Sequence, residues 1–321
     1  MKTAYAALLA LVLVVAAGCD KNEKPENGPG SEGGHAISSV KFDDLEDSDR
    51  GREVPTTVYY PNDAAGPFPV VVLSHGLGGD RSHYTYLDKH LARHGYVVIV
   101  PEHIGSSSRL NAIELAEALY SEQEARDRAA DISFVLDMAG EWNTTHPDLS
   151  GKFDMNTIGV TGHSYGGATA HFMGGTDVDF DDHYENLRDS RVDCVVPMAA
   201  GDIGGSSPWF DETSFDHYAV PCMQIAGTDD GWLGKKASYD DMPSGDKYFV
   251  ALRNVDHLDF TNAPNDWGKK ARANILICAL TTAFFDKYLK GDQHAADKYL
   301  NEEYMDKQTD WQVPDVIWYE K

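Results

Sequence analysis

Cysteine is scarce in this sequence, and its spacing fits no metal site. Four cysteines occur in 321 residues, and three of them, Cys194, Cys222 and Cys278, follow Cys19. An odd number at such wide intervals lacks the paired spacing of zinc ligands, so zinc is not indicated. Cys194 and Cys222 open two apolar runs that we expect to be neighbouring strands. They either form a disulfide there or remain buried free thiols.

Positive charge is scarce as well. The chain has 27 Lys and Arg against 52 Asp and Glu, which gives a formal net charge of -25. Such a surface repels polyanions, so nucleic acid is excluded as the expected partner. The chain shows no internal repeat, and its hydrophobic content of 42% suffices for one large core. We therefore predict a single catalytic domain over residues 37–321.

The sequence also lacks an apolar run long enough to span a membrane. The apolar stretch 4–17 is shorter than the ~20 residues that a spanning helix needs, and it follows Lys2 and precedes Gly-Cys at 18–19. Residues 1–19 are thus predicted to be a signal peptide, and their ending resembles a bacterial lipobox, in which the cysteine is lipidated. We expect an exported protein that a lipid on Cys19 anchors to a membrane of the cell envelope. A soluble secreted protein is the alternative.

Residues 20–36 contain almost no apolar side chain and are predicted to form a flexible tether. From residue 54 onward, short β-branched runs alternate with helix-like stretches, which is typical of a mostly parallel sheet covered by helices on both faces. The expected strands are 56–60, 69–74, 96–101, 157–161, 194–199, 222–226 and 248–252. The expected helices are 84–94, 111–138, one that starts at Tyr165, and 269–289. Segments 176–191 and 202–219 are expected to be irregular insertions.

The strongest motif is Gly-His-Ser-Tyr-Gly-Gly at 162–167, directly after a predicted strand and before a helix of small residues. It fits the nucleophile elbow Gly-x-Ser-x-Gly of the α/β-hydrolase fold, a sharp turn whose crowding requires glycines around the serine. The elbow exposes the Ser164 hydroxyl at a helix N-terminus, where backbone N–H groups favour negative charge. Ser164 is the predicted nucleophile, and an ordinary structural turn is the alternative.

A serine hydroxyl needs a base, and the base needs an acid that orients it. In this fold the chain order is serine, acid, histidine. His257 follows the last of the expected strands and is the predicted base. Asp230 closes a turn after the preceding strand and is the first candidate for the acid. Asp229 and Asp202 remain alternatives.

The oxyanion of acyl transfer needs hydrogen-bond donors already in place, and losing one typically costs ~2.7–4 kcal/mol. The segment His-Gly-Leu-Gly-Gly at 75–79 follows a predicted strand, where this fold places one such donor. The residue after the nucleophile supplies the other. We therefore assign the backbone N–H groups of Leu77 and Tyr165 to an oxyanion hole, with a plain glycine-rich loop as the alternative.

Segments 70–79, 91–103 and 162–168 together resemble the platelet-activating-factor acetylhydrolase family and, equally, its bacterial relatives called predicted dienelactone hydrolases. Cutinase-like polyester hydrolases are more distantly similar. The resemblance implies an α/β-hydrolase fold with Ser164 and His257 in a triad and Leu77 in the oxyanion hole. True dienelactone hydrolases use a cysteine nucleophile, so that activity is not expected here. In the animal acetylhydrolases the acid follows the sixth strand, where this chain has Met-Ala-Ala, which favours Asp230 and keeps Asp202 open.

Other side chains allow two interpretations each. Trp209, Phe210 and Trp232 lie in loops near the proposed site, where they either line an acyl pocket or pack in the core or its rim. The acidic segment 177–182 spaces carboxylates as calcium loops do, but it lacks the glycine and closing glutamate of an EF-hand, which favours a solvated loop. Two charged residues of the long helix, Arg126 and Asp131, are interpreted as surface charges.

These features predict a serine ester hydrolase that works through an acyl-enzyme and needs no cofactor or metal. Short-chain acyl esters are the first expected substrates, and polyesters or lipid esters of the cutinase type are the second. A peptidase is disfavoured because no extra domain gates the site. The alternative from another class is a non-catalytic envelope lipoprotein on a hydrolase scaffold. A metal-dependent hydrolase would need clustered ligands that the sequence does not show.

Overall fold

The computed structural model describes residues 28–321 except 181–182, 204–207, 263–266 and 309–315. Within these residues the core is a nine-stranded sheet of order β1-β4-β6-β5-β7-β10-β11-β12-β13. Its strands are β1 (Ile37–Phe42), β4 (Thr56–Pro61), β5 (Phe68–Ser74), β6 (Val97–Pro101), β7 (Phe153–His163), β10 (Cys194–Met198), β11 (Cys222–Gly227), β12 (Lys247–Leu252) and β13 (Val316–Glu320). The strands from β6 to β12 in this order are parallel, and antiparallel pairs occur only toward the edges of the described sheet. The predicted mostly parallel sheet is confirmed.

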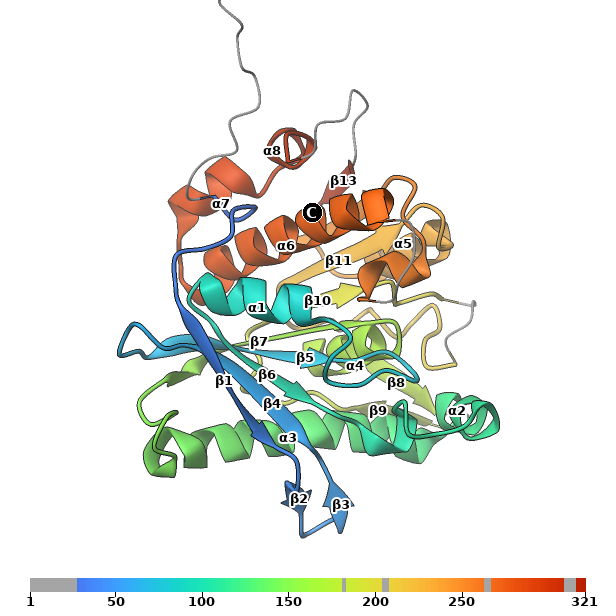
Figure 1. The fold of residues 1–321 in the computed structure, drawn as a ribbon. Coiled ribbons are helices and arrows are strands. Elements are labelled where there is room, and N and C mark those ends of the chain that lie inside the picture. Colours follow the sequence, from blue (N-terminus) through green and yellow to red (C-terminus); the bar gives the residue numbers. More distant parts are fainter. Residues whose placement is uncertain (1–27, 181–182, 204–207, 263–266, 309–315) are drawn as a thin grey trace, which may run out of the picture.

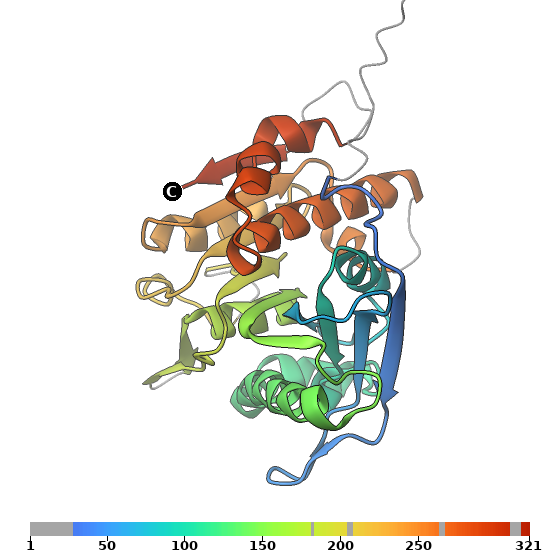
Figure 2. The ribbon, with the colours of Figure 1, turned by 90° about the vertical axis from the view of Figure 1, so that its left-hand side faces the viewer.

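Helices cover both faces of this sheet (Figures 1 and 2). On one face lie α1 (Thr85–Arg93) and α6 (Trp267–Leu289), and on the other lie α3 (Glu122–Thr145), α4 (Tyr165–Gly174) and α5 (Trp232–Asp241). Each face buries its own apolar cluster, so the central strands are apolar on both sides. The shorter elements are β2 (Glu46–Asp47), β3 (Arg52–Glu53), η1 (Ile104–Ser106), α2 (Ala112–Leu119), β8 (Asp177–Phe180), β9 (His183–Asn186), η2 (His257–Phe260), α7 (Gln293–Tyr299) and α8 (Glu302–Asp306).

The predicted helix 111–138 is in fact two helices, α2 and α3. Asn111 caps α2 in a capping box with Glu114, and the Ser121 side chain accepts a hydrogen bond from the Glu124 N–H at the start of α3. A capping side chain competes with continuous helix because it satisfies backbone donors at a new N-terminus. The Ser-x-x-Glu pattern at 121–124 was therefore a readable start signal.

The structure also differs from the prediction at the edges of the sheet and in one of the two segments expected to be irregular insertions. The half-exposed edge strands β1 and β13 were not predicted, because neither is a continuous buried apolar run. The segment 176–191, expected to be irregular, contains the antiparallel pair β8 and β9. In 202–219 the described residues form turns and irregular segments without a helix or strand, as expected.

The end of the predicted tether packs on α1. The imidazole Nε2 of His90 donates to the Pro29 carbonyl (2.9 Å), and that of His94 donates to the Ser31 carbonyl (3.0 Å). Backbone carbonyls make both contacts, so a segment poor in apolar side chains can still be held. The structure thus places Pro29 and Ser31, near the end of the predicted tether, against α1.

The predicted signal peptide, its Cys19 and the first part of the tether lie outside the described residues. In the described part of the chain no helix is both long and apolar enough to cross a membrane. Cys194, Cys222 and Cys278 are all buried, and each is a free thiol. Of the two expectations for Cys194 and Cys222, the structure therefore has the free thiols.

One carboxyl group of α1 is buried, and no hydrogen bond with another described residue offsets the cost of burying it. Asp88 is fully buried on the core-facing side of the helix, between Leu87 and Leu91, and neither carboxylate oxygen has a hydrogen-bond partner among the described residues. Burial disfavours the charged form and raises the pKa of this carboxyl well above its ordinary value. Asp88 therefore destabilises the fold increasingly as pH rises.

We expect Asp88→Asn to remove this pH dependence. An unfolded aspartate titrates near pH ~3.9. Between that pH and the raised native pKa the folded state binds the extra proton, so wild-type stability falls by ~1.36 kcal/mol per pH unit. Urea unfolding of both proteins at several pH values should show wild type losing stability against the variant as pH rises from about 4. A difference that stays constant with pH would contradict the prediction.

Candidate active site

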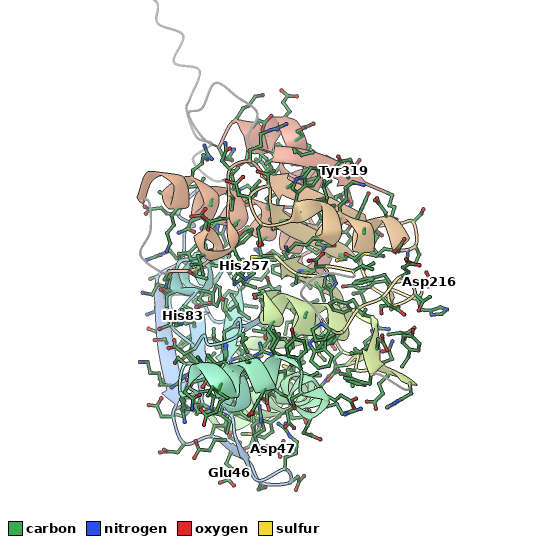
Figure 3. The ribbon with its side chains drawn as sticks, turned by 90° about the vertical axis from the view of Figure 1, so that its right-hand side faces the viewer. Glu46, Asp47, His83, Asp216, His257 and Tyr319 are labelled. Carbon is green, nitrogen blue, oxygen red and sulfur yellow. The ribbon has the colours of Figure 1, made fainter. Side chains whose placement is uncertain are left out.

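The site lies at the carboxyl ends of the parallel strands, where this class of sheet binds ligands. Loops after β5, β7, β10, β11 and β12 converge on a cavity of about 340 Å³. In Figure 3, His257 lies near the middle of the face turned toward the viewer. The cavity is lined by Leu77, Leu119, Ser164, Tyr165, Ala168, Ala199, Ala200, Gly201, Asp202, Trp209, Asp230, Lys235 and His257.

Ser164 occupies a strained turn between β7 and α4. Its backbone has φ 57° and ψ −121°, a conformation that side-chain-bearing residues rarely adopt. A Cβ on Gly162 would collide with the Gly166 carbonyl, and a Cβ on Gly166 would collide with the Ser74 carbonyl. The glycines are therefore required by close backbone approach, and the turn has the geometry of the predicted elbow.

Gly166→Ala is expected to lower the free energy of unfolding by about 3 kcal/mol, because the Ser74 backbone cannot move away without displacing β5. Gly140→Ala is the matched control. It lies within α3, where an added Cβ meets nothing within 4 Å, and alanine there should stabilise the helix by about 1 kcal/mol. Urea unfolding of both variants checks the pair. Equal stability of the two variants would show that the elbow is not sterically constrained.

A hydrogen-bonded chain joins three of the predicted residues. His257 Nε2 lies 2.9 Å from Ser164 Oγ, and His257 Nδ1 lies 2.9 Å from Asp230 Oδ2. If Nδ1–H donates to the carboxylate, the Nε2 lone pair faces the serine hydroxyl, which is the tautomer that a general base requires. Among the three acid candidates it is Asp230 that contacts the imidazole.

The other two acid candidates lie elsewhere. Asp229 is exposed and accepts a hydrogen bond from the neighbouring Thr228 hydroxyl (3.3 Å). Asp202 lines the same cavity, but its carboxylate lies against Gly234 at the start of α5. Both follow strands of the sheet, so chain order alone could not separate them from Asp230.

Lys235 is a cavity residue that the sequence reasoning missed. Its ammonium donates to the Asp230 carbonyl and lies 3.4 Å from Asp230 Oδ2, the oxygen that also faces His257. Its side chain is only 7% exposed. Lys235 therefore forms an ion pair with the carboxylate that contacts His257. Its position five residues after Asp230, in the first turns of α5, is the only sequence signal that could have found it.

The backbone N–H groups of Leu77 and Tyr165 are free at the cavity, since neither donates to another described residue. Both neighbours of Leu77 are held, however. The Gly76 N–H donates to the Tyr84 hydroxyl (3.2 Å), and the Gly78 N–H donates to the Ser106 carbonyl (2.8 Å). Two unpaired donors on a fixed backbone beside Ser164 match the requirement of an oxyanion hole.

Of the three aromatic candidates, only Trp209 lines the cavity. Its ring stacks on Tyr165, with 6.3 Å between centroids. Phe210 instead packs in the core against Phe172 and Phe215, and Trp232 packs near Phe249 on the outer strands. Phe210 and Trp232 are therefore not pocket residues in this structure, because each packs its ring against other aromatic side chains instead.

The charged residues of the long helix differ from each other. Arg126 is partly exposed and pairs with Glu122 and Glu185, in line with a surface charge. Asp131 is fully buried and accepts hydrogen bonds from His103 (2.9 Å) and from Arg50 (2.7 Å). The interpretation of Asp131 as a surface charge is therefore wrong, because its partners come from distant segments.

Within the described residues no group of three or more His, Cys, Asp or Glu side chains could hold a metal ion. The predicted acidic segment 177–182 falls partly on residues 181–182, which lie outside the description. Of its described carboxylates, that of Asp177 accepts a hydrogen bond from the Asn186 amide (3.1 Å) and pairs with His217 (3.0 Å).

Comparison with known proteins agrees with this geometry. A family profile described as PET hydrolase-like matches residues 48–306, most of the chain. The chain is 26% identical to cutinase est1 of Thermobifida alba over 65% of its own length and 58% of the cutinase. It is 24% identical to platelet-activating factor acetylhydrolase of Cavia porcellus over 36% of its length and 34% of that protein. It is 24% identical to bis(hydroxyethyl) terephthalate hydrolase of Streptomyces coelicolor over 74% of its length and 62% of that enzyme.

The chain thus spans about a third to three fifths of the length of these relatives. Their names include two of the protein groups to which the sequence motifs pointed, so the expected resemblance is confirmed. Because the family profile covers more than half of the chain, the doubly wound sheet and the elbow can be assigned to a family. The chain belongs to the PET hydrolase-like family, and its fold is the α/β-hydrolase fold.

Proposed function

We propose that the chain is a serine ester hydrolase with Ser164 as nucleophile, His257 as base and Asp230 as acid. The observation that carries this proposal is the hydrogen-bonded chain from Ser164 through His257 to Asp230 at the edge of the cavity. Relatives named as a cutinase, an acetylhydrolase and a terephthalate-ester hydrolase support the same reaction class.

The proposed reaction has two acyl-transfer steps. His257 Nε2 takes the proton of Ser164 Oγ as this oxygen attacks the ester carbonyl carbon, and the carbonyl electron pair moves onto its oxygen. The N–H groups of Leu77 and Tyr165 stabilise that oxyanion. The intermediate collapses, the alcohol leaves with the proton from His257, and an acyl-serine remains. Water, deprotonated by His257, then releases the acid and restores Ser164.

Short-chain acyl esters are the substrates that we propose. The cavity is near the lower end of ligand-binding volumes, which run from ~300 to ~1,000 Å³, and Ala168, Ala199, Ala200 and Gly201 leave room beside Ser164 for a small acyl group. Aromatic polyesters are a second candidate, which the relative that hydrolyses bis(hydroxyethyl) terephthalate favours. The ratio of kcat/KM for that ester and for p-nitrophenyl butyrate separates the two.

The direct test combines turnover and labelling. We expect hydrolysis of p-nitrophenyl acetate and butyrate, weaker hydrolysis of the octanoate, and a fluorophosphonate adduct on the peptide that contains Ser164. Folded protein that hydrolyses none of the three esters and takes no label would overturn the proposal in favour of a non-catalytic binding protein.

Export and lipid anchoring at Cys19 are also proposals. They rest on the charged start, the apolar run and the lipobox-like ending of residues 1–19. Palmitate incorporation and membrane fractionation in a bacterial host, with Cys19→Ala alongside, test them. Equal labelling of both proteins would exclude lipidation at this residue.

A further inference from the structure

Arg128 is a charged side chain that is completely buried beneath the site. Its exposed fraction is 0%, although burying an unpaired guanidinium is very costly. Every nitrogen of the guanidinium donates: Nε to Thr169 Oγ1 (2.9 Å), Nη1 to Ser106 Oγ (2.6 Å), and Nη2 to Ser74 Oγ (3.0 Å) and to the His75 carbonyl. One planar group therefore connects the end of β5, the η1 turn and α4. A planar fork of donors suits this task, because its bonds fix direction as well as distance.

Two of these segments hold the loop that carries the Leu77 N–H. The His75 carbonyl, which accepts from Arg128, lies two residues before Leu77. On the other side of Leu77, the Gly78 N–H donates to the backbone of Ser106 (2.8 Å), whose hydroxyl also accepts from Arg128. Arg128 thus fixes the backbone on both sides of Leu77.

The third segment carries the Tyr165 N–H. The Arg128 guanidinium lies 4.4 Å from the centroid of the Tyr165 ring, a distance at which cation–π attraction operates. Thr169 Oγ1 accepts from Arg128 and donates to the Tyr165 carbonyl (2.9 Å). The same side chain therefore contacts both halves of the candidate oxyanion hole.

A second layer fixes the orientation of Arg128. Burial lowers the pKa of His103 well below its ordinary value, so its imidazole is neutral. Its Nδ1–H then donates to Asp131 (2.9 Å), its Nε2 accepts from the Ser74 hydroxyl (2.9 Å), and Ser74 Oγ accepts from Arg128. Ser74 and His103 each donate once and accept once between a donor-only guanidinium and an acceptor-only carboxylate, so the series has a single direction. Glu124 accepts a hydrogen bond from the Ser106 hydroxyl (2.7 Å) and contacts Arg52 (3.1 Å).

We propose that Arg128 is a positioning residue for ester hydrolysis: it sets the distance between the Leu77 and Tyr165 N–H groups that hold the oxyanion. This inference rests on the proposed function and adds a residue that touches neither substrate nor Ser164. Donors help most when they are aimed at the oxyanion before the reaction, so a loosened pair binds the substrate about as well but the transition state less well. The expected signature is a loss in kcat rather than a rise in KM.

The test compares Arg128→Met with Arg126→Met. Both arginines are on α3, but Arg126 pairs with Glu122 and Glu185 near the surface. For p-nitrophenyl butyrate we expect Arg128→Met to lower kcat by about 100-fold with KM changed less than about 3-fold, comparable to losing one oxyanion donor. Arg126→Met should stay within about 3-fold of wild type. Arg128→Lys, which keeps the charge but not the fork, should recover only part of the loss.

A second measurement separates positioning from general damage. A trifluoromethyl ketone that forms a tetrahedral adduct with the serine should lose affinity for Arg128→Met by about the same factor as kcat/KM, as expected for an analogue of the transition state. If the Arg128 variants do not fold, Thr169→Val replaces them, since it removes one acceptor of Arg128 at nearly constant volume, and an approximately 10-fold loss of kcat and of ketone affinity is expected.

Folded Arg128→Met with wild-type kcat would overturn the proposal, and so would a loss of kcat with ketone affinity unchanged. In the absence of folded Arg128 variants, wild-type kinetics of Thr169→Val would do the same. These results leave the proposed function standing as long as wild type turns over and is labelled at Ser164. Inert wild-type protein would instead overturn the function itself.

Discussion

Ser164→Ala is expected to lower kcat for p-nitrophenyl butyrate by about 10⁶-fold. The variant keeps the Cβ and the strained backbone of the elbow but has no oxygen to attack the ester. The cavity and the two free N–H groups remain, so some acceleration over water should survive. Steady-state kinetics on protein of verified purity measures the effect, since a trace of wild type would mask it.

The matched control for this variant is Ser48→Ala, an exposed serine in the β2–β3 turn. Its kcat should equal that of wild type. A loss of less than about 100-fold for Ser164→Ala would show that the hydroxyl is not the nucleophile, because removing the serine of the best-studied triad costs about 10⁶-fold.

Asp230→Asn is expected to lower kcat by about 10⁴-fold, with little change in KM. The NH₂ group of the new asparagine can donate to His257 Nδ1. The imidazole then carries its proton on Nε2, and this N–H points toward Ser164. Such an imidazole cannot accept the serine proton. The pH dependence of kcat is measured from acid to alkaline conditions. Protein that stays folded but has a low kcat shows the tautomer effect, whereas lost structure shows unfolding.

Asp202→Asn serves as the comparison for Asp230→Asn, because Asp202 lines the same cavity but lies against Gly234 rather than His257. Its kcat should remain within about 10-fold of wild type. Equal losses in both variants would mean that the two carboxylates share the role. A loss for Asp202→Asn alone would transfer the role of the acid to Asp202.

The parts of the fold that follow from local patterns could be predicted from the sequence. The buried central strands are continuous apolar runs, and the elbow requires glycines at fixed distances from Ser164, so both are visible in a short window. The order of serine, acid and histidine, together with a position shortly after an expected strand, limited the candidates for the acid to three carboxylates. It could not select Asp230, because Asp202 also follows a strand and only the three-dimensional path of the loops separates them.

The buried polar network beneath the site could not be predicted. Arg128 and Asp131 interrupt an apolar stripe of α3 that includes Ala125 and Ile132, a pattern that also fits charges at the border of an amphipathic face. Both side chains are buried because they form hydrogen bonds with residues far away in the chain, among them Ser74 and His103. Long-range hydrogen bonds leave no signal in a short stretch of sequence, whereas a helix cap such as Ser121 leaves a local one.

The three buried thiols have a practical consequence for work with this protein. A thiol reacts as its thiolate, and burial raises the pKa of Cys194 well above its ordinary value and that of Cys222 to about 12. Burial likewise raises the pKa of the Cys278 thiol. In the folded protein these three thiols are therefore protected from reagents that alkylate thiolates, and their state should be the same in preparations with and without reductant. An electrophilic inhibitor that inactivates the native enzyme can accordingly be attributed to a side chain other than these thiols.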